Sequence, residues 1–497
     1  MTSQLTLKTM AQVSPETLLP NYRPTEHRSG IVHLGAGAFH RAHQAAYTDD
    51  LLAMHGGDWR ITAVSLRSPS VRDKLASQNY LYTLSEKSNV RHHIRVIGAI
   101  ERILVAPDDP EKVIEVLADP LTKIVTLTVT EKGYCHAQKS DLLDFENTDI
   151  AADLKSPEKP KSMPGFLSAA FARRMARGLG GLTILSCDNL PNNGRILVSV
   201  VLEFTSRSRP EVVSWIKEHV TFCNTVVDRI VPATTDQDIS DVSQKLGLCD
   251  KGAVLCEPYR QWIIEDNFCT ERPRWEDVGA TFVKDVAPFE AMKLRLLNGS
   301  HSILAYLGHL TGHQYIHQAI QTPALEHLIT RFMDKEVSPT LGLPAGYDLE
   351  AYKEAIKVRF ANAQIHYGTQ QVASDGSKKI LQRWLSTAED LIDMGGRPAV
   401  IAFSIAGWFR YLEASDELNR TYKVIDPMAQ ALTRIAQQLS HEEERQVTAL
   451  VEATGIFSPT LCGSSVFIKD IIFWLTQMHQ EGLDTALTNF LNTVDKS

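Results

Sequence analysis

Residues 30–67 read "GIVHLGAGAFHRAHQAAYTDDLLAMHGGDWRITAVSLR", and this stretch decides the fold class. It contains an apolar run, a turn with two glycines, a helical pattern and a second apolar run. A strand, a glycine turn, a helix and a second strand form a βαβ unit, which implies a parallel sheet. Further apolar strand patterns follow at residues 123–130 and 182–187. We therefore predict an α/β fold with parallel strands in the N-terminal part of the chain.

Polar or glycine-rich clusters follow three of the predicted strands. They are the glycine turn at residues 35–37, "EKGY" at residues 131–134 and "DNLPNNG" at residues 188–194. Ligands of open α/β sheets bind beyond the carboxyl ends of the strands, so we expect the three clusters to border one cleft. Residues 139–165 are rich in charge, Pro and Ser, and are predicted to be a surface excursion.

The chain of 497 residues is too long for one ordinary hydrophobic core, so more than one domain is expected. Beyond about residue 289 strand patterns become rare and helical patterns dominate, for example at residues 350–364 and 427–440. The sequence therefore predicts a sheet-containing domain over residues 1–288 and a mostly helical domain over residues 289–497.

The charge of the chain is mildly acidic. Lys and Arg number 51 against 59 Asp and Glu, which gives a formal net charge of −8. An acidic surface repels polyanions, so nucleic acid and anionic membranes are not expected as general partners. We expect a small-molecule substrate as the partner, and a chain that is a monomer or a weak oligomer.

The sequence pattern contains no targeting or membrane segment. The first residues lack an apolar run behind a basic start, so no signal peptide is expected. The longest apolar segment, residues 399–409, is far shorter than the roughly 20 residues of a membrane span, and it is predicted to be a buried helix. The seven cysteines form no CxxC pair and are odd in number. These features favour unpaired thiols and a cytoplasmic location.

The glycine turn after the first predicted strand is a candidate cofactor site. Gly35 and Gly37 permit a tight turn that brings backbone amides close to a pyrophosphate, and Ala38 and Phe39 follow in the same turn. His40 stands where the dinucleotide fingerprint has its third glycine. The pattern predicts a dinucleotide site, with a plain βα turn as the alternative.

The end of the second predicted strand bears on which dinucleotide binds. An acidic residue that binds the adenosine ribose usually stands there, but this chain has Arg67 and Ser68. Because an arginine at this position could accept a 2′-phosphate, the residues leave both NAD and NADP open.

His40 and His43 are three residues apart on the predicted helix, which raises the question of a metal pair. No Cys, Asp or Glu at ligand spacing joins them, whereas a zinc site needs three or four ligands. We therefore expect no metal. The favoured alternative is a helix that faces the cofactor cleft, with the two histidines and Arg41 making hydrogen bonds.

Residues 293–301, "KLRLLNGSH", place an amine, a carboxamide and an imidazole in a leucine-rich run near the predicted domain boundary. At about 100° per residue in a helix, Lys293, Asn298 and His301 share one polar arc. Glu290 falls on the same arc, and apolar residues occupy the opposite side. The Asn-Gly pair is unfavourable in a helix interior, which suggests a functional constraint. The alternative is a solvated helix face.

These side chains suit one kind of chemistry. Partial removal from water favours the neutral form of a lysine amine, so Lys293 could act as acid and base near neutral pH. Asn298, and Asn189 beyond the strand predicted at residues 182–187, could donate hydrogen bonds to a developing alkoxide. With His301 and without a metal, these groups suit hydride transfer at a secondary alcohol.

The chain resembles the polyol-specific long-chain dehydrogenase family, which includes mannitol 2-dehydrogenase and fructuronate reductase. The matching motifs are "GAGAFHRAHQA" (35–45), "TVTEKGYC" (128–135), "SCDN" (186–189), "VDRIVP" (227–232), "EPYRQWIIEDNF" (257–268) and "PFEAMKLRLLNGSH" (288–301). The Lys-x4-Asn-x2-His spacing in the last motif is specific. The resemblance implies a Rossmann-type dinucleotide-binding domain over residues 1–288 and a helical substrate-binding domain over residues 289–497.

The resemblance also implies roles for the polar residues. Lys293 would be the general acid and base, and Asn189 and Asn298 would stabilise the oxyanion. His301 would orient the substrate, and Glu290 would gate proton exchange with solvent. A cofactor-binding sensor without turnover is disfavoured because these residues are present, and a zinc-dependent dehydrogenase is disfavoured because no Cys/His/Glu cluster is apparent.

Cofactor and substrate follow from the same resemblance. Asp228 matches a position near the nicotinamide, and the cofactor is expected to be NAD, with NADP possible. The motifs "TEKGYC", "EDNF" and "NGSHSILAYLG" are closest to the fructuronate reductase branch, and Gln371 stands where mannitol enzymes have an arginine. We therefore expect interconversion of D-fructuronate and D-mannonate, with mannitol 2-dehydrogenase or a tagaturonate enzyme as alternatives. Lys379 and Arg383 are candidates to bind the uronate carboxylate.

Overall fold

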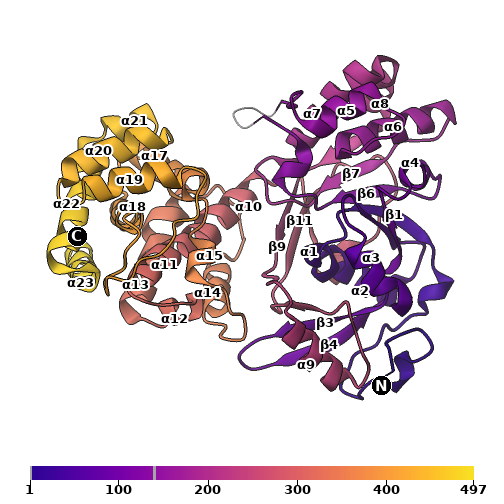
Figure 1. Cartoon of the computed structure of the whole chain (residues 1–497), viewed down its shortest axis with the longest axis horizontal. Helices are drawn as coiled ribbons and strands as arrows, with labels where there is room; N and C mark the ends of the chain where they lie inside the picture. The colour runs from indigo at the N-terminus through magenta and orange to yellow at the C-terminus, as the bar shows by residue number, and fades with distance from the viewer. Residues whose placement is uncertain (1–2, 138–141, 497) are drawn as a thin grey trace. The chain divides into compact units, whose positions relative to one another are not determined.

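The structure, a computed structural model, describes residues 3–137 and 142–496. The chain divides into two compact units, Met1–Ala287 and Pro288–Ser497. Every strand assigned among the described residues lies in the first unit, and the second unit is built from helices (Figure 1).

Six parallel strands form the main sheet of the first unit, in the order β5-β2-β1-β6-β7-β8. The strands are β1 (Ser29–Leu34), β2 (Arg60–Ser65), β5 (Ile100–Val105), β6 (Ile124–Leu127), β7 (Thr183–Ser186) and β8 (Thr221–Cys223). The chain begins in the middle, builds outward to β5, and then builds in the opposite direction from β6 to β8. This is the strand order of a Rossmann fold, whose direction reverses between β1 and β6. The predicted parallel α/β fold is confirmed.

Helices cover both faces of this sheet. Since successive strand residues point to opposite sides, each strand contributes to two cores. In β1, Ile31 belongs to a core that also contains residues of α2 (Gln44–His55). Its neighbour Val32 belongs to a second core with α6 (Met163–Ala176) and α7 (Asn193–Ser208). Burial from both sides explains why the sequences of these strands are almost continuously apolar. The other helices of the unit are α1 (Ala38–Ala42), α3 (Ser70–Leu75), α4 (Pro110–Leu117), α5 (Thr148–Lys155), α8 (Val213–His219) and α9 (Asp236–Leu246).

Two three-stranded sheets complete the first unit, in the orders β12-β11-β9 and β10-β3-β4. Their strands are β3 (Tyr82–Lys87), β4 (His92–Ile97), β9 (Thr225–Asp228), β10 (Val254–Cys256), β11 (Gln261–Glu265) and β12 (Thr281–Val283). The antiparallel pairing of β9 with β11 sets Asp228 opposite Gln261. Two of the quoted motifs, at residues 227–232 and 257–268, are therefore neighbours in the fold.

The segment predicted as a surface excursion, residues 139–165, is only partly at the surface where the structure describes it; residues 139–141 lie outside the described residues. Ile150 on α5 is fully buried in the core on the α6 side of the main sheet. Asp153 is buried too, and its carboxylate accepts hydrogen bonds from the backbone N–H (2.8 Å) and hydroxyl (2.6 Å) of Ser162. The polar composition of this segment predicts that its polar groups are hydrogen-bonded to solvent. In the structure a buried carboxylate satisfies some of them.

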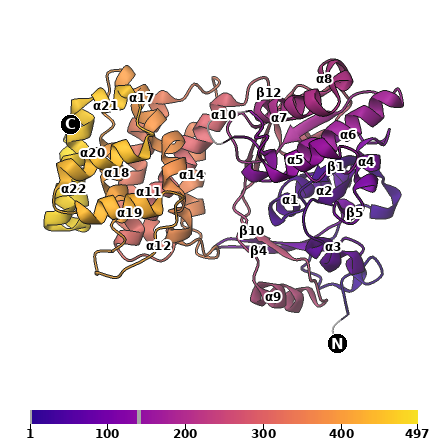
Figure 2. The same cartoon turned by 45° about the horizontal axis from the view of Figure 1, so that its top comes forward.

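The second unit is organised around two apolar helices, α11 (Gly299–Leu310) and α18 (Ala399–Tyr411), which pack against each other (Figure 2). α18 also packs against α22 (Ser465–Glu481), and its residues 400–409 are buried throughout, as predicted for residues 399–409. Among the described residues, no helix is both long and apolar enough to cross a membrane. The remaining helices are α10 (Ala287–Met292), α12 (Ile316–Ile320), α13 (Pro323–Arg331), α14 (Leu349–Phe360), α15 (Thr369–Val372), α16 (Gly376–Ile380), α17 (Ser386–Asp393), α19 (Ala429–Gln438), α20 (Glu443–Thr454), α21 (Pro459–Gly463) and α23 (Leu483–Val494).

Candidate functional site

The glycine turn lies at the carboxyl end of β1, where the strand order reverses. Gly35 has φ +105°, and a Cβ atom there would lie 2.1 Å from the carbonyl oxygen of Thr128. Only glycine fits, because a side chain would collide with the backbone that follows β6. The hydroxyl of Thr128 donates to the Gly35 carbonyl at 2.8 Å, and the Gly35 N–H donates to the carbonyl of Val64 in β2 at 2.9 Å. The turn is thus fixed on both sides.

Gly37 differs from Gly35 in having open space in front of it. The nearest atom to a Cβ at Gly37 would be the Gly35 carbonyl oxygen, 3.9 Å away. Ala38 and Phe39 continue from it into α1. A fixed turn with an open backbone approach at the reversal point fits the pyrophosphate of a dinucleotide.

The helix that follows the turn faces the interior of the unit, which corrects the prediction that it faces the cleft. The rings of His40 and His33 stack with centroids 3.4 Å apart, and both residues are fully buried. His43 Nε2 lies 2.8 Å from the carbonyl oxygen of Gln261, and Arg41 donates to the carbonyl oxygen of Gly252 at 2.5 Å. These partners come from β11 and the chain before β10, which the local sequence cannot reveal.

The described residues contain neither a cluster that could bind a metal ion nor a disulfide bond. No three His, Cys, Asp or Glu side chains there cluster in a way that could hold a metal ion. All seven cysteines lie in the described part of the chain and all are free thiols.

Arg67 and Ser68 follow β2, and each has a partner within the first unit. A guanidinium nitrogen of Arg67 lies 2.6 Å from a carboxylate oxygen of Asp149 on α5. The Ser68 hydroxyl accepts the N–H of Ser70 at 3.2 Å, at the start of α3. The acidic residue that the sequence lacks beside β2 is therefore supplied by a distant segment, and no local signal points to Asp149.

Asp188, a residue for which the sequence predicts no role, joins the ends of β6 and β7. Its buried carboxylate accepts the backbone N–H groups of Val129 (3.0 Å) and Thr130 (2.8 Å) and the hydroxyl of Tyr134 (2.9 Å). Burial raises the pKa of Asp188 to about 6, against the opposing effect of these hydrogen bonds. Asn189, a candidate catalytic residue, comes next in the chain and is exposed. Asp188 therefore fixes the backbone that presents Asn189.

Thr130 carries backbone strain at the same place. Its φ of +64° and ψ of +165° lie in a region that is almost restricted to glycine. Such a conformation costs about 1–3 kcal/mol in a residue with a Cβ and persists only where its surroundings impose it. The hydrogen bond from the Thr130 N–H to Asp188 is part of what imposes it here.

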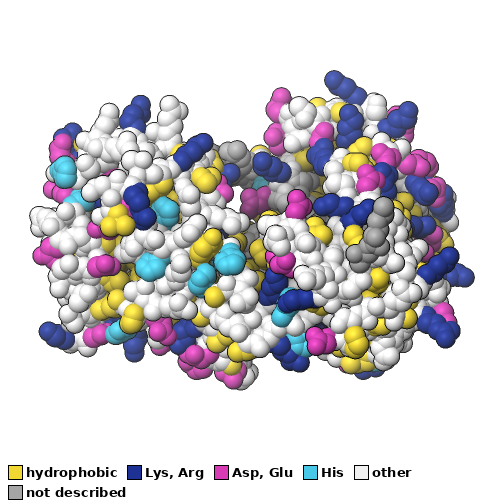
Figure 3. All heavy atoms as spheres, turned by 60° about the horizontal axis from the view of Figure 1, so that its bottom comes forward, with side chains coloured by type: hydrophobic (Ala, Val, Ile, Leu, Met, Phe, Trp, Pro, Cys, Tyr) yellow, Lys and Arg dark blue, Asp and Glu magenta, His cyan; other side chains and the backbone are white. Residues whose placement is uncertain are grey.

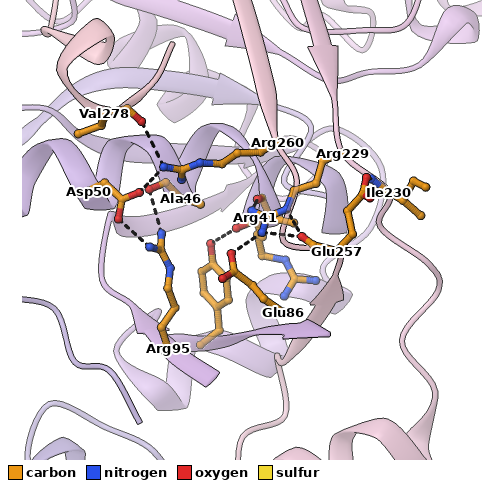
Figure 4. Close-up of polar contacts among 12 residues, drawn as sticks. Arg41, Ala46, Asp50, Glu86, Arg95, Arg229, Ile230, Glu257, Arg260 and Val278 are labelled. Carbon is orange, nitrogen blue, oxygen red and sulfur yellow. Dashed lines mark hydrogen bonds and ion pairs between the residues drawn. The ribbon is translucent and has the colours of Figure 1, made fainter. Parts of the chain in front are cut away.

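Asp228 is buried at the end of β9. The next residue, Arg229, anchors this strand end, as Figure 4 shows. The Arg229 guanidinium donates to the carbonyl oxygens of Ala42 (2.6 Å) and Glu257 (3.0 and 2.8 Å). It also pairs with the carboxylate of Glu86 on β3. One buried arginine therefore links the motifs at residues 227–232 and 257–268 to the end of α1.

In the second unit, Lys293–Asn298 forms a π-helical segment between α10 and α11. The predicted arc assumes 100° per residue, which a π-helical segment does not follow, so the regular-helix prediction is wrong here. Lys293 and His301 are each 7% exposed, and this burial excludes a solvated helix face. Glu290 on α10 is half-buried. π-Helical segments inside helices are frequent at functional sites.

The glycine after Asn298 has a packing role. A Cβ atom at Gly299 would lie 2.9 Å from the ring of Phe332 and 3.0 Å from the carbonyl oxygen of Arg383. The indole N–H of Trp384 donates to the Gly299 carbonyl at 3.0 Å. The poor helix propensity of the Asn-Gly pair is thus explained by close contact with the segment that carries Arg383.

Arg383, a predicted substrate residue, lies against the start of α11. Its guanidinium donates to the hydroxyl of Ser302 at 2.7 Å and to the carbonyl oxygen of Asn298 at 3.4 Å. Among the described residues no acid forms an ion pair with it, and burial lowers its pKa. The other candidate, Lys379, donates to the Ser374 carbonyl at 2.7 Å and lies 3.8 Å from a carboxylate oxygen of Asp375. Arg383 is therefore the less neutralised of the two cations.

His301 sits among aromatic rings and cations. Its ring centroid lies 5.0 Å from that of Phe360 and 5.1 Å from that of Tyr367. Burial holds the pKa of His301 well below its usual value, and nearby cations add to this effect. Those cations are Arg383, Arg359 and Lys379. The imidazole is therefore neutral at neutral pH and can both donate and accept a hydrogen bond.

Three polar atoms at the start of α11 are buried without a hydrogen-bond partner in the structure. One is the hydroxyl oxygen of Ser300, and the other two belong to predicted site residues: the amide oxygen Oδ1 of Asn298 and the ring nitrogen Nε2 of His301. Leaving such an atom unsatisfied costs about 1–3 kcal/mol, so native proteins rarely do so without a reason. A hydroxyl-rich ligand would satisfy the atoms of Asn298 and His301.

A depression of about 550 Å³ opens at the other end of α11. Its lining consists of His309, Gly312, His313, Gln314, Tyr315, Gly368, Thr369, Gln370, Gln371, Asp416, Arg420, Thr421 and Tyr422. Histidine side chains are visible on the surface of this unit in Figure 3. Gln371 belongs to this depression, whereas Lys293, Asn298 and His301 do not line it.

The reversal point of the sheet and its glycine turn define the first unit as a Rossmann-type dinucleotide-binding domain. Residues 29–277 match the family model of the mannitol dehydrogenase Rossmann domain, and residues 285–479 match that of the mannitol dehydrogenase C-terminal domain. The chain belongs to the mannitol dehydrogenase family and is an oxidoreductase.

Similar proteins cover nearly the whole chain. D-mannonate oxidoreductase from Escherichia coli (strain K12) is 41% identical over 467 residues, which cover 93% of this chain and 96% of that protein. A solved structure of Pseudomonas fluorescens mannitol 2-dehydrogenase, a ternary complex with NAD and D-mannitol, is 37% identical with a TM-score of 0.86. The match covers 98% of this chain and 99% of that one. A D-sorbitol dehydrogenase in substrate-free form is 32% identical with a TM-score of 0.91, and the match covers 97% of this chain and 100% of that one.

Proposed function

We propose that this chain is an NAD-dependent dehydrogenase that interconverts D-fructuronate and D-mannonate. The observation that carries the proposal is the start of α11, where Asn298 and His301 keep buried polar atoms unsatisfied beside Arg383. Unsatisfied hydrogen-bonding atoms favour a polyhydroxylated ligand, and a cation without an acidic partner favours a carboxylate on it. The similarity to D-mannonate oxidoreductase supports the same substrate class.

For cofactor binding we propose the turn formed by Gly35, Gly37, Ala38 and Phe39, together with Asp228. The open backbone approach at Gly37 supports binding of the pyrophosphate, and the NAD complex of a 37% identical relative supports the choice of NAD. Bound NADH supplies the hydride that reduces the carbonyl carbon.

The protein's own residues move the proton and stabilise the charge. In the reduction, Lys293 as the ammonium donates a proton to the carbonyl oxygen, and in the oxidation its free amine accepts the proton back. Asn298 and Asn189 are proposed to donate hydrogen bonds to the developing alkoxide. Neutral His301 holds a substrate hydroxyl, and Glu290 passes protons between Lys293 and solvent.

Arg383 is proposed to recognise the uronate carboxylate, with Lys379 as a weaker second cation. A charge-assisted hydrogen bond contributes about 1.5–3 kcal/mol, which corresponds to roughly tenfold to hundredfold discrimination between substrates. Fructose has no carboxylate and would gain nothing from Arg383.

The test is a substrate panel with NADH and NADPH, comparing fructuronate, tagaturonate and fructose, with the corresponding reduced compounds in the other direction. We expect kcat/KM for fructuronate to exceed that for fructose by roughly tenfold to hundredfold. Arg383→Gln should collapse this ratio. Arg397→Gln, which removes an arginine paired with Asp470 elsewhere in the unit, should leave the ratio unchanged. Equal turnover of fructose by the unaltered protein would instead assign it as a mannitol 2-dehydrogenase.

A further inference from the structure

The end of β2 lies at the same sheet edge as the glycine turn. Leu34 pairs with Val64 across the parallel strands, and the Gly35 N–H donates to the Val64 carbonyl at 2.9 Å. In Rossmann folds the residue after the second strand meets the adenosine ribose, and an acid there selects NAD. This chain has Arg67 at that position, a residue that by itself favours the 2′-phosphate of NADP.

Asp149 changes the charge that Arg67 presents. Its carboxylate lies 2.6 Å from the Arg67 guanidinium, and its side chain is 23% exposed. The pair is therefore within reach of a ligand and is not part of the core. Carboxylate and guanidinium together present little net charge to an approaching nucleotide.

The position of Asp149 is fixed by the fold of α5. The side chain of Asn147 caps this helix by accepting the Asp149 N–H at 3.0 Å. The next residue, Ile150, is fully buried in the core against which Leu66, the neighbour of Arg67, also packs. Both ends of the ion pair are thus anchored in one core.

The buried thiol of Cys135 is influenced by both charged groups. The pKa of the Cys135 thiol is raised to about 11, mainly by burial; Asp149 contributes to the rise and Arg67 opposes it. The charges of Asp149 and Arg67 thus act in opposite directions on this thiol, which lies in the chain segment that follows β6.

We propose that Asp149 is the residue that makes this protein prefer NAD over NADP, by neutralising Arg67 and repelling a 2′-phosphate. This inference rests on the proposed dinucleotide function. A phosphate that binds Arg67 must displace the Asp149 carboxylate, which is already paired with it. The negative charge of the phosphate must then lie close to the negative charge of that carboxylate. A ribose 2′-hydroxyl meets neither obstacle and can donate a hydrogen bond to Asp149.

The first experiment measures the dissociation constants of NADH and NADPH by nucleotide fluorescence, and then kcat/KM with each. Asp149→Asn removes the charge and keeps the shape, and should shift the binding ratio towards NADPH by about tenfold, the size of one charge pair roughly 3 Å apart at the dielectric constant of water. Glu111→Gln is the matched control, because Glu111 pairs with Arg173 elsewhere in the unit and should leave the ratio unchanged.

A second variant separates the roles of the two residues. Arg67→Ala alters a side chain that is 64% exposed, so the fold should tolerate it. It leaves the Asp149 charge unpaired and should weaken NADPH binding several-fold relative to NADH. In the Asp149→Asn/Arg67→Ala double variant, the gain in NADPH binding should disappear.

The outcomes distinguish this inference from the proposed function. If the unaltered protein binds neither nucleotide, the proposed function fails. If it binds nucleotides but Asp149→Asn and Arg67→Ala both leave the NADPH to NADH ratio unchanged, the cofactor function stands and the role of Asp149 is overturned.

Discussion

Two sites of the molecule, one in each unit, satisfy their polar groups in opposite ways. At the sheet edge of the first unit, the Asp188 carboxylate accepts three hydrogen bonds from the protein, and the Gly35 carbonyl accepts one from Thr128. At the start of α11 in the second unit, Asn298 and His301 keep buried polar atoms without a partner.

This difference separates a preformed support from a site that a ligand completes. A fully paired network keeps its shape whether or not a ligand is bound, so changes in it should affect stability and cofactor binding. Atoms that the protein leaves unsatisfied gain hydrogen bonds when a ligand binds, so changes there should affect turnover more than folding.

The strongest test of the contrast is Lys293→Ala. We expect kcat to fall by at least ~10²–10⁴-fold, the contribution of a positioned acid and base. In the unaltered protein, reduction should fade and oxidation should grow as pH rises, because the two directions need opposite protonation states of the same amine. The measurement is kcat in both directions across pH.

Lys353→Ala is the control for removal of a buried lysine from the second unit. Lys353 is 5% exposed and pairs with Asp334 and Glu350. Its loss should lower the melting temperature and change kcat little. If Lys293→Ala keeps the kcat and pH profile of the unaltered protein, Lys293 has no catalytic role.

The next largest effect is expected for the two asparagines. Asn298→Ala and Asn189→Ala should each lower kcat by about 10²–10³-fold, as the loss of one oxyanion donor does. The pH midpoint should stay in place, because an amide does not titrate. A shift of the midpoint with little loss of kcat would point to an indirect effect on Lys293.

Asp188→Asn tests the support in the first unit. Asparagine keeps one acceptor oxygen and replaces the other with an NH2 group, so the N–H of either Val129 or Thr130 loses its acceptor. The strained turn should weaken, with a loss of about 1–3 kcal/mol in the free energy of unfolding and weaker cofactor binding. Because the folded-state pKa of Asp188 is raised to about 6, protonation favours the folded state, and the unaltered protein should lose stability as pH rises from about 4 to about 6. Denaturant unfolding at several pH values should show this dependence weakened in the variant. An equal pH dependence in both proteins would contradict it.

The smallest effect is expected at a paired cluster in the second unit. His479 lies with its two ring nitrogens 2.8 Å from the carboxylates of Glu413 and Glu443, and these carboxylates raise its pKa against the opposing effect of burial. A raised histidine pKa stabilises the folded state below about pH 6.5, and this contribution is lost as pH rises through the folded-state value.

His479→Gln should therefore remove part of the difference in melting temperature between pH 6 and pH 8 and leave kcat unchanged. A fall in kcat would show that the paired clusters and the unsatisfied site of this unit are not independent.

The sequence by itself determined the features that depend on neighbouring residues. Apolar runs and the glycine turn at residues 30–67 specify strand, turn and helix locally, and burial on both faces makes the parallel strands continuously apolar. The buried helix at residues 399–409 follows from composition in the same way. The quoted motifs identified the family and the two domain types, because they carry specific residue types at fixed spacing.

Only the tertiary structure decided which distant groups meet. Asp149 meets Arg67, and Asp188 supports the turn after β6, through contacts that no local pattern encodes. The same holds for the π-helical segment at Lys293–Asn298, which accompanies the close approach of Gly299 to Phe332. Secondary structure arises from hydrogen bonds between near neighbours, whereas the charge and burial of a side chain depend on every segment that packs around it.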